Sequence, residues 1–104
     1  MTIPKLIAFY FPQFHEIPEN NKWWGQGFTD WKLVKEAKPL FDKHHQPRVP
    51  YNEDYYNPIE AKTLKKQALL ANKYGVNGWM FYHYWFDGKL YLEKPMETFL
   101  ADKD

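Results

Sequence analysis

Histidine and aromatic residues gather in two short segments whose side chains suit a binding site. One segment is Pro12-Gln13-Phe14-His15, and the other runs from Tyr82 to Asp87 with the sequence Tyr-His-Tyr-Trp-Phe-Asp. Aromatic rings stack on the apolar faces of sugar rings, whereas histidine, glutamine and carboxylate groups bond sugar hydroxyls. This mixture favours a carbohydrate site over an apolar cofactor pocket.

The stretch that begins with the first segment, residues 12–57, contains more side chains of the same kinds. It holds five prolines, nine aromatic residues and three of the four histidines. Two readings stay open for some of them, since His83 also suits a buried core histidine and Trp24 also suits a residue that packs its loop. Trp79 and Phe81 are expected in the core. The candidate contacts to sugar hydroxyls and ring faces are His15, Trp24, Asp30, Trp31, Gln46, Tyr82, His83 and Trp85.

Several other chemistries do not fit the sequence. The chain has no cysteine, which excludes disulfides and thiolate catalysis, and no serine for a nucleophile elbow. The histidine spacing is not that of a zinc site, and Gly25-Gln26-Gly27 lacks the third glycine of a phosphate loop. We therefore expect no metal and no cofactor. Glycoside chemistry needs two carboxylates across the bond, and spacing pairs none of the 13 acidic residues, so no catalytic residue is assigned.

Charge and hydropathy exclude two classes of partner. Fourteen Lys and Arg against 13 Asp and Glu give a net charge of +1, too little to draw the chain onto nucleic acid or an anionic membrane. The apolar run from Leu6 to Pro12 is too short to span a bilayer and lacks a signal-peptide cleavage site. The sequence predicts a cytoplasmic protein with no nucleic-acid partner and no membrane insertion.

The elements that position the two segments follow from sequence pattern. Two mostly apolar runs, 5–11 and 78–86, predict buried strands, the second ending at an Asp87-Gly88 turn. Residues 58–74 predict a helix with Asn57 as N-cap, Pro58 at its first position and Gly75 after its end. A further helix is expected near Thr29–Ala37 with Thr29 as cap. The last helix is expected from about Glu93, with Leu100 on its apolar side.

This order describes one βαβ unit and the start of the next, which is typical of a parallel sheet. Ligands meet such sheets at the carboxyl ends of the strands, where both histidine-containing segments fall. Two strands and one full helix do not close a domain. The sequence therefore predicts that residues 1–104 are a single incomplete domain, the N-terminal piece of a larger α/β protein or a part that must assemble.

Several separated motifs resemble the WbsX-like family, from about residue 5 to residue 100. The motifs that carry the resemblance are Ile7–His15, Trp23–Trp31, Lys38–Phe41, Gln46–Pro50, Tyr74–Gly78, Phe81–Phe86 and Leu92–Pro95. The resemblance implies a glycosyltransferase of cell-surface polysaccharide (O-antigen type) biosynthesis, related to glycoside hydrolase family 99. It also implies an α/β fold in which the chain is the N-terminal βαβ portion of a (β/α)8 TIM-type barrel, with a long irregular loop after the first strand.

The resemblance further implies that the catalytic carboxylates lie on later strands, beyond residue 104. Position 30 is often Glu in the family and is Asp here, which shortens the reach of its carboxylate. We expect a fragment of a carbohydrate-active protein, transferase-like or hydrolase-like, that binds a carbohydrate or sugar nucleotide and is inactive alone. The alternative is a non-catalytic carbohydrate-binding or complementation module of a split barrel, whose remaining part is another chain. A gene remnant without function and a protein that binds metal through its four histidines are weaker alternatives.

Overall fold

The computed structural model describes residues 2–103 and divides into two compact units. The first unit combines Met1–Pro12 with Asn57–Asp104, and the second is Gln13–Tyr56. The expectation of a single incomplete domain stays a prediction. Each unit is described by itself.

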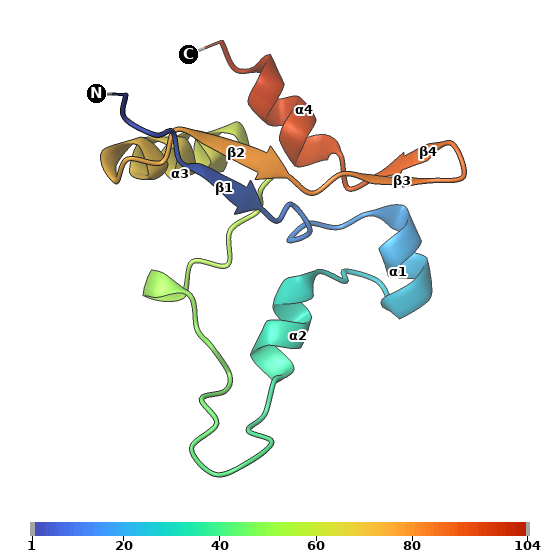
Figure 1. Ribbon diagram of the computed structural model, residues 1–104. Coiled ribbons are helices and arrows are strands. Elements are labelled where there is room, and N and C mark those ends of the chain that lie inside the picture. The colour runs from blue at the N-terminus through green and yellow to red at the C-terminus, as the bar shows by residue number, and fades with distance from the viewer. Residues whose placement is uncertain (1, 104) are drawn as a thin grey trace. The chain divides into compact units, whose positions relative to one another are not determined.

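The first unit contains a pair of parallel strands, a β-hairpin and two helices. Figure 1 shows their arrangement. Strand β1 (Ile7–Tyr10) pairs in parallel with β2 (Gly78–Phe81), with Ile7 opposite Gly78 and Tyr10 opposite Phe81. The helices are α3 (Ala61–Lys73) and α4 (Lys94–Ala101). The parallel pairing confirms the predicted strand–helix–strand order. A side-chain clamp extends the pairing, because Asn77 Oδ1 accepts a 2.8 Å hydrogen bond from the backbone N–H of Leu6.

Both helices pack on the same face of this sheet. The Tyr10 hydroxyl of β1 donates a 2.6 Å hydrogen bond to Gln67 Oε1 of α3. On β2, the rings of Trp79 and Phe81 lie 5.1 and 5.7 Å from the ring of Phe99 in α4. Trp79 and Phe81, which were predicted in the core, face α4 but are only half-buried.

The opposite face of the sheet is apolar and exposed. Ile7 is 54% exposed, Phe9 73% and Met80 54%, and side chains alternate along a strand, so these three point away from the helices. The strands were predicted to be buried on both faces. Within the described residues of the first unit only one face is covered.

Helix α3 begins later than predicted and ends where predicted. Asn57 and Pro58 do not start it: Asn57 Oδ1 instead accepts a hydrogen bond from the Ile59 N–H (3.2 Å), which closes a turn ahead of the helix, and Glu60 is the N-cap. At the other end Gly75 has φ +81°. The Val76 N–H bonds the Ala71 carbonyl at 2.9 Å, which is the Schellman ending that a glycine permits.

The predicted strand 78–86 is wrong as one element, because β2 ends at Phe81 and the chain leaves the sheet after Tyr82, whose N–H still bonds the Tyr10 carbonyl. Residues Tyr84–Phe86 form β3, which pairs antiparallel with β4 (Lys89–Tyr91), a strand that the sequence analysis did not predict. The turn between them has positive φ at both central residues, 49° at Asp87 and 74° at Gly88. Asp-Gly suits this turn because the pair tolerates positive φ, so the chain reverses instead of running on. The hairpin continues away from the end of β2 (Figure 1).

Helix α4 starts at Lys94 after the N-cap Glu93, close to the predicted start. The expectation that Leu100 lies on its apolar side is wrong: Leu100 is 66% exposed. The preceding residue, Phe99, faces the sheet instead, and its ring contacts the rings of Trp79 and Phe81.

The second unit contains α1 (Pro18–Trp24), α2 (Asp30–Glu36) and a single 3-10 turn, Tyr51–Glu53. Helix α2 confirms the helix predicted near Thr29–Ala37. Thr29 occupies the N-cap position but its side chain makes no cap hydrogen bond. Helix α1 was not predicted. Asn21 of α1 holds the loop that leads from α1 to α2. Its Oδ1 accepts hydrogen bonds from the N–H groups of Gly27 and Phe28, both at 3.1 Å.

Candidate functional site

The eight candidate residues divide between the two units. The second unit holds His15, Trp24, Asp30, Trp31 and Gln46, and the first holds Tyr82, His83 and Trp85. Each group is considered within its own unit.

In the second unit, Asp30 lies at the start of α2 and has a partner from the Pro-Gln-Phe-His segment. Gln13 Nε2 donates a hydrogen bond to Asp30 Oδ2 at 3.3 Å, and both side chains are half-buried. The amide thus orients the carboxylate while leaving its other oxygen available as an acceptor for a hydroxyl. Gln13 was not among the candidates, although its place in the segment pointed to it.

Trp31 is the centre of an aromatic cluster rather than an open platform. Its ring lies 4.2 Å from that of Phe14, and it meets Tyr55 and Tyr56 edge-on, each at 5.2 Å. Its Nε1–H donates a 2.8 Å hydrogen bond to the Tyr56 carbonyl. These contacts hold α2 against both ends of the unit, so Trp31 organises the fold. Direct stacking of Trp31 on a sugar stays a prediction.

The other three candidates of this unit differ in exposure. Trp24 is 63% exposed and stacks on Phe28 with ring centroids 5.8 Å apart, so much of its ring is open to a ligand. His15 is only 2% exposed, which favours a role inside the unit over contact with a ligand from solvent. Gln46 is half-buried and precedes a cis bond to Pro47.

In the first unit, all three candidates follow the carboxyl end of β2. The Tyr82 N–H donates to the Tyr10 carbonyl at 3.1 Å, so Tyr82 still follows the sheet, and its side chain is 49% exposed. His83 is exposed, which contradicts the alternative of a buried core histidine. Trp85, 66% exposed, lies opposite Leu90 in the hairpin.

The hairpin also carries aromatic residues that the sequence analysis did not single out. Tyr82, Tyr84, Phe86 and Tyr91 form a continuous series, here called the aromatic row. Successive ring centroids lie 6.5, 6.4 and 5.6 Å apart. The aromatic residues at positions 82, 84 and 86 alternate with period two, which is the signal that could have placed them on one face.

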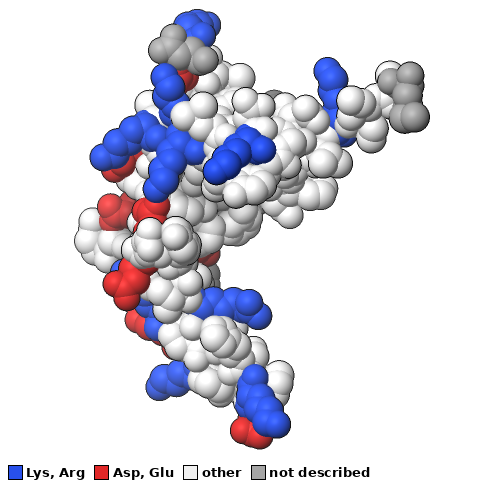
Figure 2. All heavy atoms as spheres, turned by 90° about the vertical axis from the view of Figure 1, so that its left-hand side faces the viewer, with Lys and Arg blue, Asp and Glu red and all other residues white. Residues whose placement is uncertain are grey.

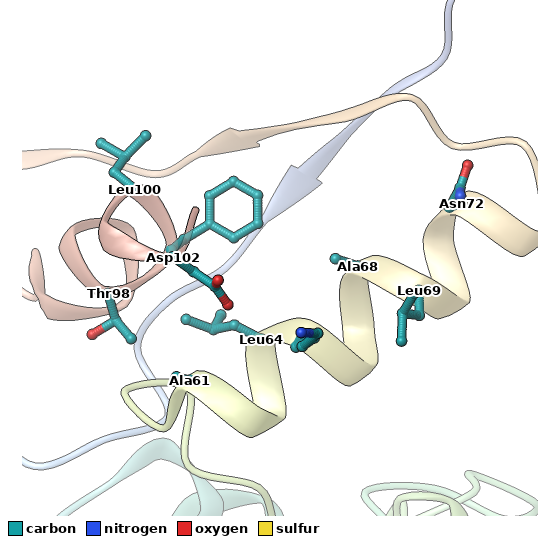
Figure 3. Close-up of a pocket in the computed structure, with 10 residues that line it drawn as sticks. Ala61, Leu64, Ala68, Leu69, Asn72, Thr98, Leu100 and Asp102 are labelled. Carbon is teal, nitrogen blue, oxygen red and sulfur yellow. The ribbon is translucent and has the colours of Figure 1, made fainter. Parts of the chain in front are cut away.

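A separate pocket of about 470 Å³ lies between α3 and α4 (Figure 3). Leu64 and Ala68 point from α3 toward α4, and the other side is lined by Thr98, Phe99 and Leu100 of α4 together with Asp102 just after it. Its walls are mostly apolar and include none of the eight candidates. The pocket therefore belongs to the seam between two helices and not to the predicted sugar site.

The charged side chains do not define a site either. Figure 2 shows Lys and Arg side chains together with Asp and Glu on the face in view. On α4, the hydrogen bond from Lys94 Nζ to Glu97 Oε2 (2.9 Å) and the nearby charge of Glu97 raise the pKa of Lys94 above its ordinary value. Across residues 2–103, no group of three His, Asp or Glu side chains is placed to hold a metal ion. No helix in that range is long and apolar enough to cross a membrane.

Comparison with known proteins gives one family and related proteins of one species. The sequence model of the family described as "Glycosyltransferase WbsX" matches residues 6–104. Proteins named "Uncharacterized protein WxcX" from two strains of Xanthomonas campestris pv. campestris are each 47% identical to the chain over 102 residues. That match covers 97% of the chain but 15% of each relative. No solved structure matches the chain. Because the family match covers nearly all residues, the chain belongs to the WbsX glycosyltransferase family.

Proposed function

We propose that this chain forms a sugar-binding part of a carbohydrate-active protein that transfers or hydrolyses glycosyl groups in the making of cell-surface polysaccharide. The observation that carries the proposal is the family match over residues 6–104. The chain spans only 15% of the relatives' length. We propose that the catalytic carboxylates lie outside it and that the chain alone is inactive.

Exposure and chemistry assign roles among the candidates. Tyr82 and Trp85 each offer a ring face for stacking, and the exposed imidazole of His83 bonds a hydroxyl. In the second unit, Trp24 offers a ring face and Asp30, oriented by Gln13, offers an acceptor. His15 and Trp31 support the fold around these groups.

We propose the (β/α)8 barrel, and with it the relation to glycoside hydrolase family 99, as the architecture of the complete protein. Three observations support it: β1 and β2 are parallel, both helices lie on one face of their sheet, and the other face is apolar. A doubly wound sheet would carry helices on both faces, whereas a barrel keeps them outside and fills its interior with apolar side chains.

The second candidate function is a complementation module that completes a split barrel. The exposed apolar face formed by Ile7, Phe9 and Met80 favours it, because such a face needs cover from further strands. A stable complex with a WxcX polypeptide that lacks the matching 102 residues would support this function, and no association would contradict it.

Saturation-transfer NMR on the 104-residue chain tests the first proposal. The probes are rhamnose, mannose, their oligosaccharides and a nucleoside diphosphate sugar. We expect transfer from aromatic protons to sugar protons, and weaker transfer in His83→Ala. His45→Ala is the matched control, because His45 is also exposed but is not assigned to the site. Absence of transfer to every probe, or an equal loss in both variants, would contradict the assignment.

A further inference from the structure

The aromatic row offers more ring surface than a single sugar can use. Tyr82, Tyr84 and Phe86 follow one another along the chain, with neighbouring centroids 6.5 and 6.4 Å apart, and Tyr91, opposite Tyr84 in the hairpin, lies beside them with its centroid 5.6 Å from that of Phe86. The rings do not converge on one point, as the wall of a monosaccharide pocket would. A ligand that contacts all of them must be long.

Other aromatic rings support the row at Tyr82, and its members in the hairpin lie on one face of the hairpin. The ring of Phe11 meets Tyr82 edge-on at 5.6 Å, and Phe9 contacts Tyr82 at 6.1 Å. In the hairpin, Tyr84 lies opposite Tyr91, so cross-strand pairing puts both rings on one face. Tyr82 is 49% exposed and Phe86 60%. Trp85 and Leu90 form the next cross-strand pair and therefore lie on the other face.

The chemistry of the row fits a neutral, hydroxyl-rich ligand. Three of its four members carry phenolic hydroxyls, which donate and accept hydrogen bonds beside the ring faces. The charges at the tip of the hairpin are one acid, Asp87, and one base, Lys89, whose Nζ lies 5.1 Å above the Tyr91 ring. These opposite charges leave no net field to select a polyanion such as a nucleic acid.

We propose that the aromatic row is a binding track for an extended, uncharged oligosaccharide, with successive sugar rings stacked along Tyr82, Tyr84 and Phe86 and with Tyr91 widening the track beside Tyr84 and Phe86. This inference rests on the proposed function and specifies its substrate class: a growing or cleavable glycan chain rather than a lone sugar or a sugar nucleotide. The track continues from the carboxyl end of β2, the end at which parallel sheets meet their ligands.

The test is calorimetric titration of the 104-residue chain with mono-, di-, tetra- and hexasaccharides of one rhamnose series and one mannose series. We expect affinity to rise at least tenfold from monosaccharide to tetrasaccharide. Phe86→Leu keeps an apolar side chain but removes a flat ring, and it should weaken tetrasaccharide binding about tenfold, the effect of losing one stacked ring. Leu70→Ala, which removes a 57% exposed apolar side chain on α3, away from the row and from the candidate residues, is the control and should bind as the parent does.

Tyr84→Leu is the second variant, and the amide NMR shifts of Lys89 and Leu90 show whether each variant keeps the hairpin. Equal affinity for mono- and hexasaccharides, or unchanged binding in both ring variants, would overturn the track while leaving the proposed function standing. Tighter binding of a sugar nucleotide than of the tetrasaccharide would do the same. Self-association that Phe86→Leu abolishes would assign the row to a second copy of the chain. Loss of all carbohydrate binding would overturn both proposals.

Discussion

The hydrogen bond between Tyr10 and Gln67 provides a direct test of how α3 is held to the sheet. The Tyr10 hydroxyl donates to Gln67 Oε1 at 2.6 Å, and Tyr10 is only 9% exposed. Tyr10→Phe removes the donor but keeps the ring, which lies 4.7 Å from Trp79 and 4.8 Å from Phe81. The change in stability therefore reports the hydrogen bond and not the packing.

The expected loss follows from the burial of the acceptor. Leaving a buried acceptor without its donor costs about 1–3 kcal/mol, and Gln67 is half-buried, so we expect about 1–2 kcal/mol. For a chain of this size that corresponds to a fall of roughly 4–16 °C in Tm. Urea unfolding followed by tryptophan fluorescence measures it, because Trp79 stacks directly on Tyr10.

A double-mutant cycle separates the bond from indirect effects. Gln67→Leu alone should also destabilise, and the Tyr10→Phe/Gln67→Leu double variant should lose about 1 kcal/mol less than the sum of the single losses. Tyr74→Phe is the control, since Tyr74 is 70% exposed and its hydroxyl should contribute less than about 0.5 kcal/mol. Strict additivity of the two single changes would refute the conclusion that this bond joins β1 to α3.

Three further predictions concern the first unit. Leu64→Ala removes the side chain that is 2% exposed on α3 and should cost about 2–5 kcal/mol in urea unfolding; a cost below 1 kcal/mol would contradict its place in the core. Gly75→Ala places a side chain at φ +81° and should cost about 1–2 kcal/mol in thermal unfolding, so an unchanged Tm would argue against the Schellman ending. Because Glu97 raises the pKa of Lys94, their pair stabilises the fold at pH values below the ordinary lysine pKa, and this contribution is lost as pH rises through the raised pKa. In an NMR titration, Glu97→Gln should lower the pKa of Lys94, and an unchanged pKa would contradict the pairing.

Local signals in the sequence predicted the elements that depend on local chemistry. Gly75 marks the end of α3 because a left-handed residue is needed there, and the apolar runs mark β1 and β2. The start of α3 was wrong because Asn57 has two uses, as a helix cap or as the acceptor of a turn, and the sequence pattern is the same for both. The hairpin was missed because three aromatic residues extended the apparent strand through Tyr82 and His83.

The site was predicted less completely than the fold. Residue type pointed to Tyr82, His83 and Trp85, and all three are exposed at the end of β2. Residue type alone did not separate Trp24 from Trp31. Trp24 is 63% exposed, whereas three rings surround Trp31, and this difference arises from tertiary packing. Sugar binding by the candidates and a cytoplasmic location stay predictions.

The parallel pairing of β1 and β2 also has a consequence for how the chain folds. The clamp between Leu6 and Asn77 joins residues 71 positions apart, so the sheet forms only by closing a long loop, an entropic cost that local structure avoids. The β3–β4 hairpin and the Gln13–Tyr56 unit involve shorter separations and should form earlier. At roughly 5–20 residues per second of synthesis, β1 waits about 4–14 s on the ribosome for its partner. During that interval the backbone N–H and C=O groups of β1 have no strand partner, which leaves them open to pairing with other chains.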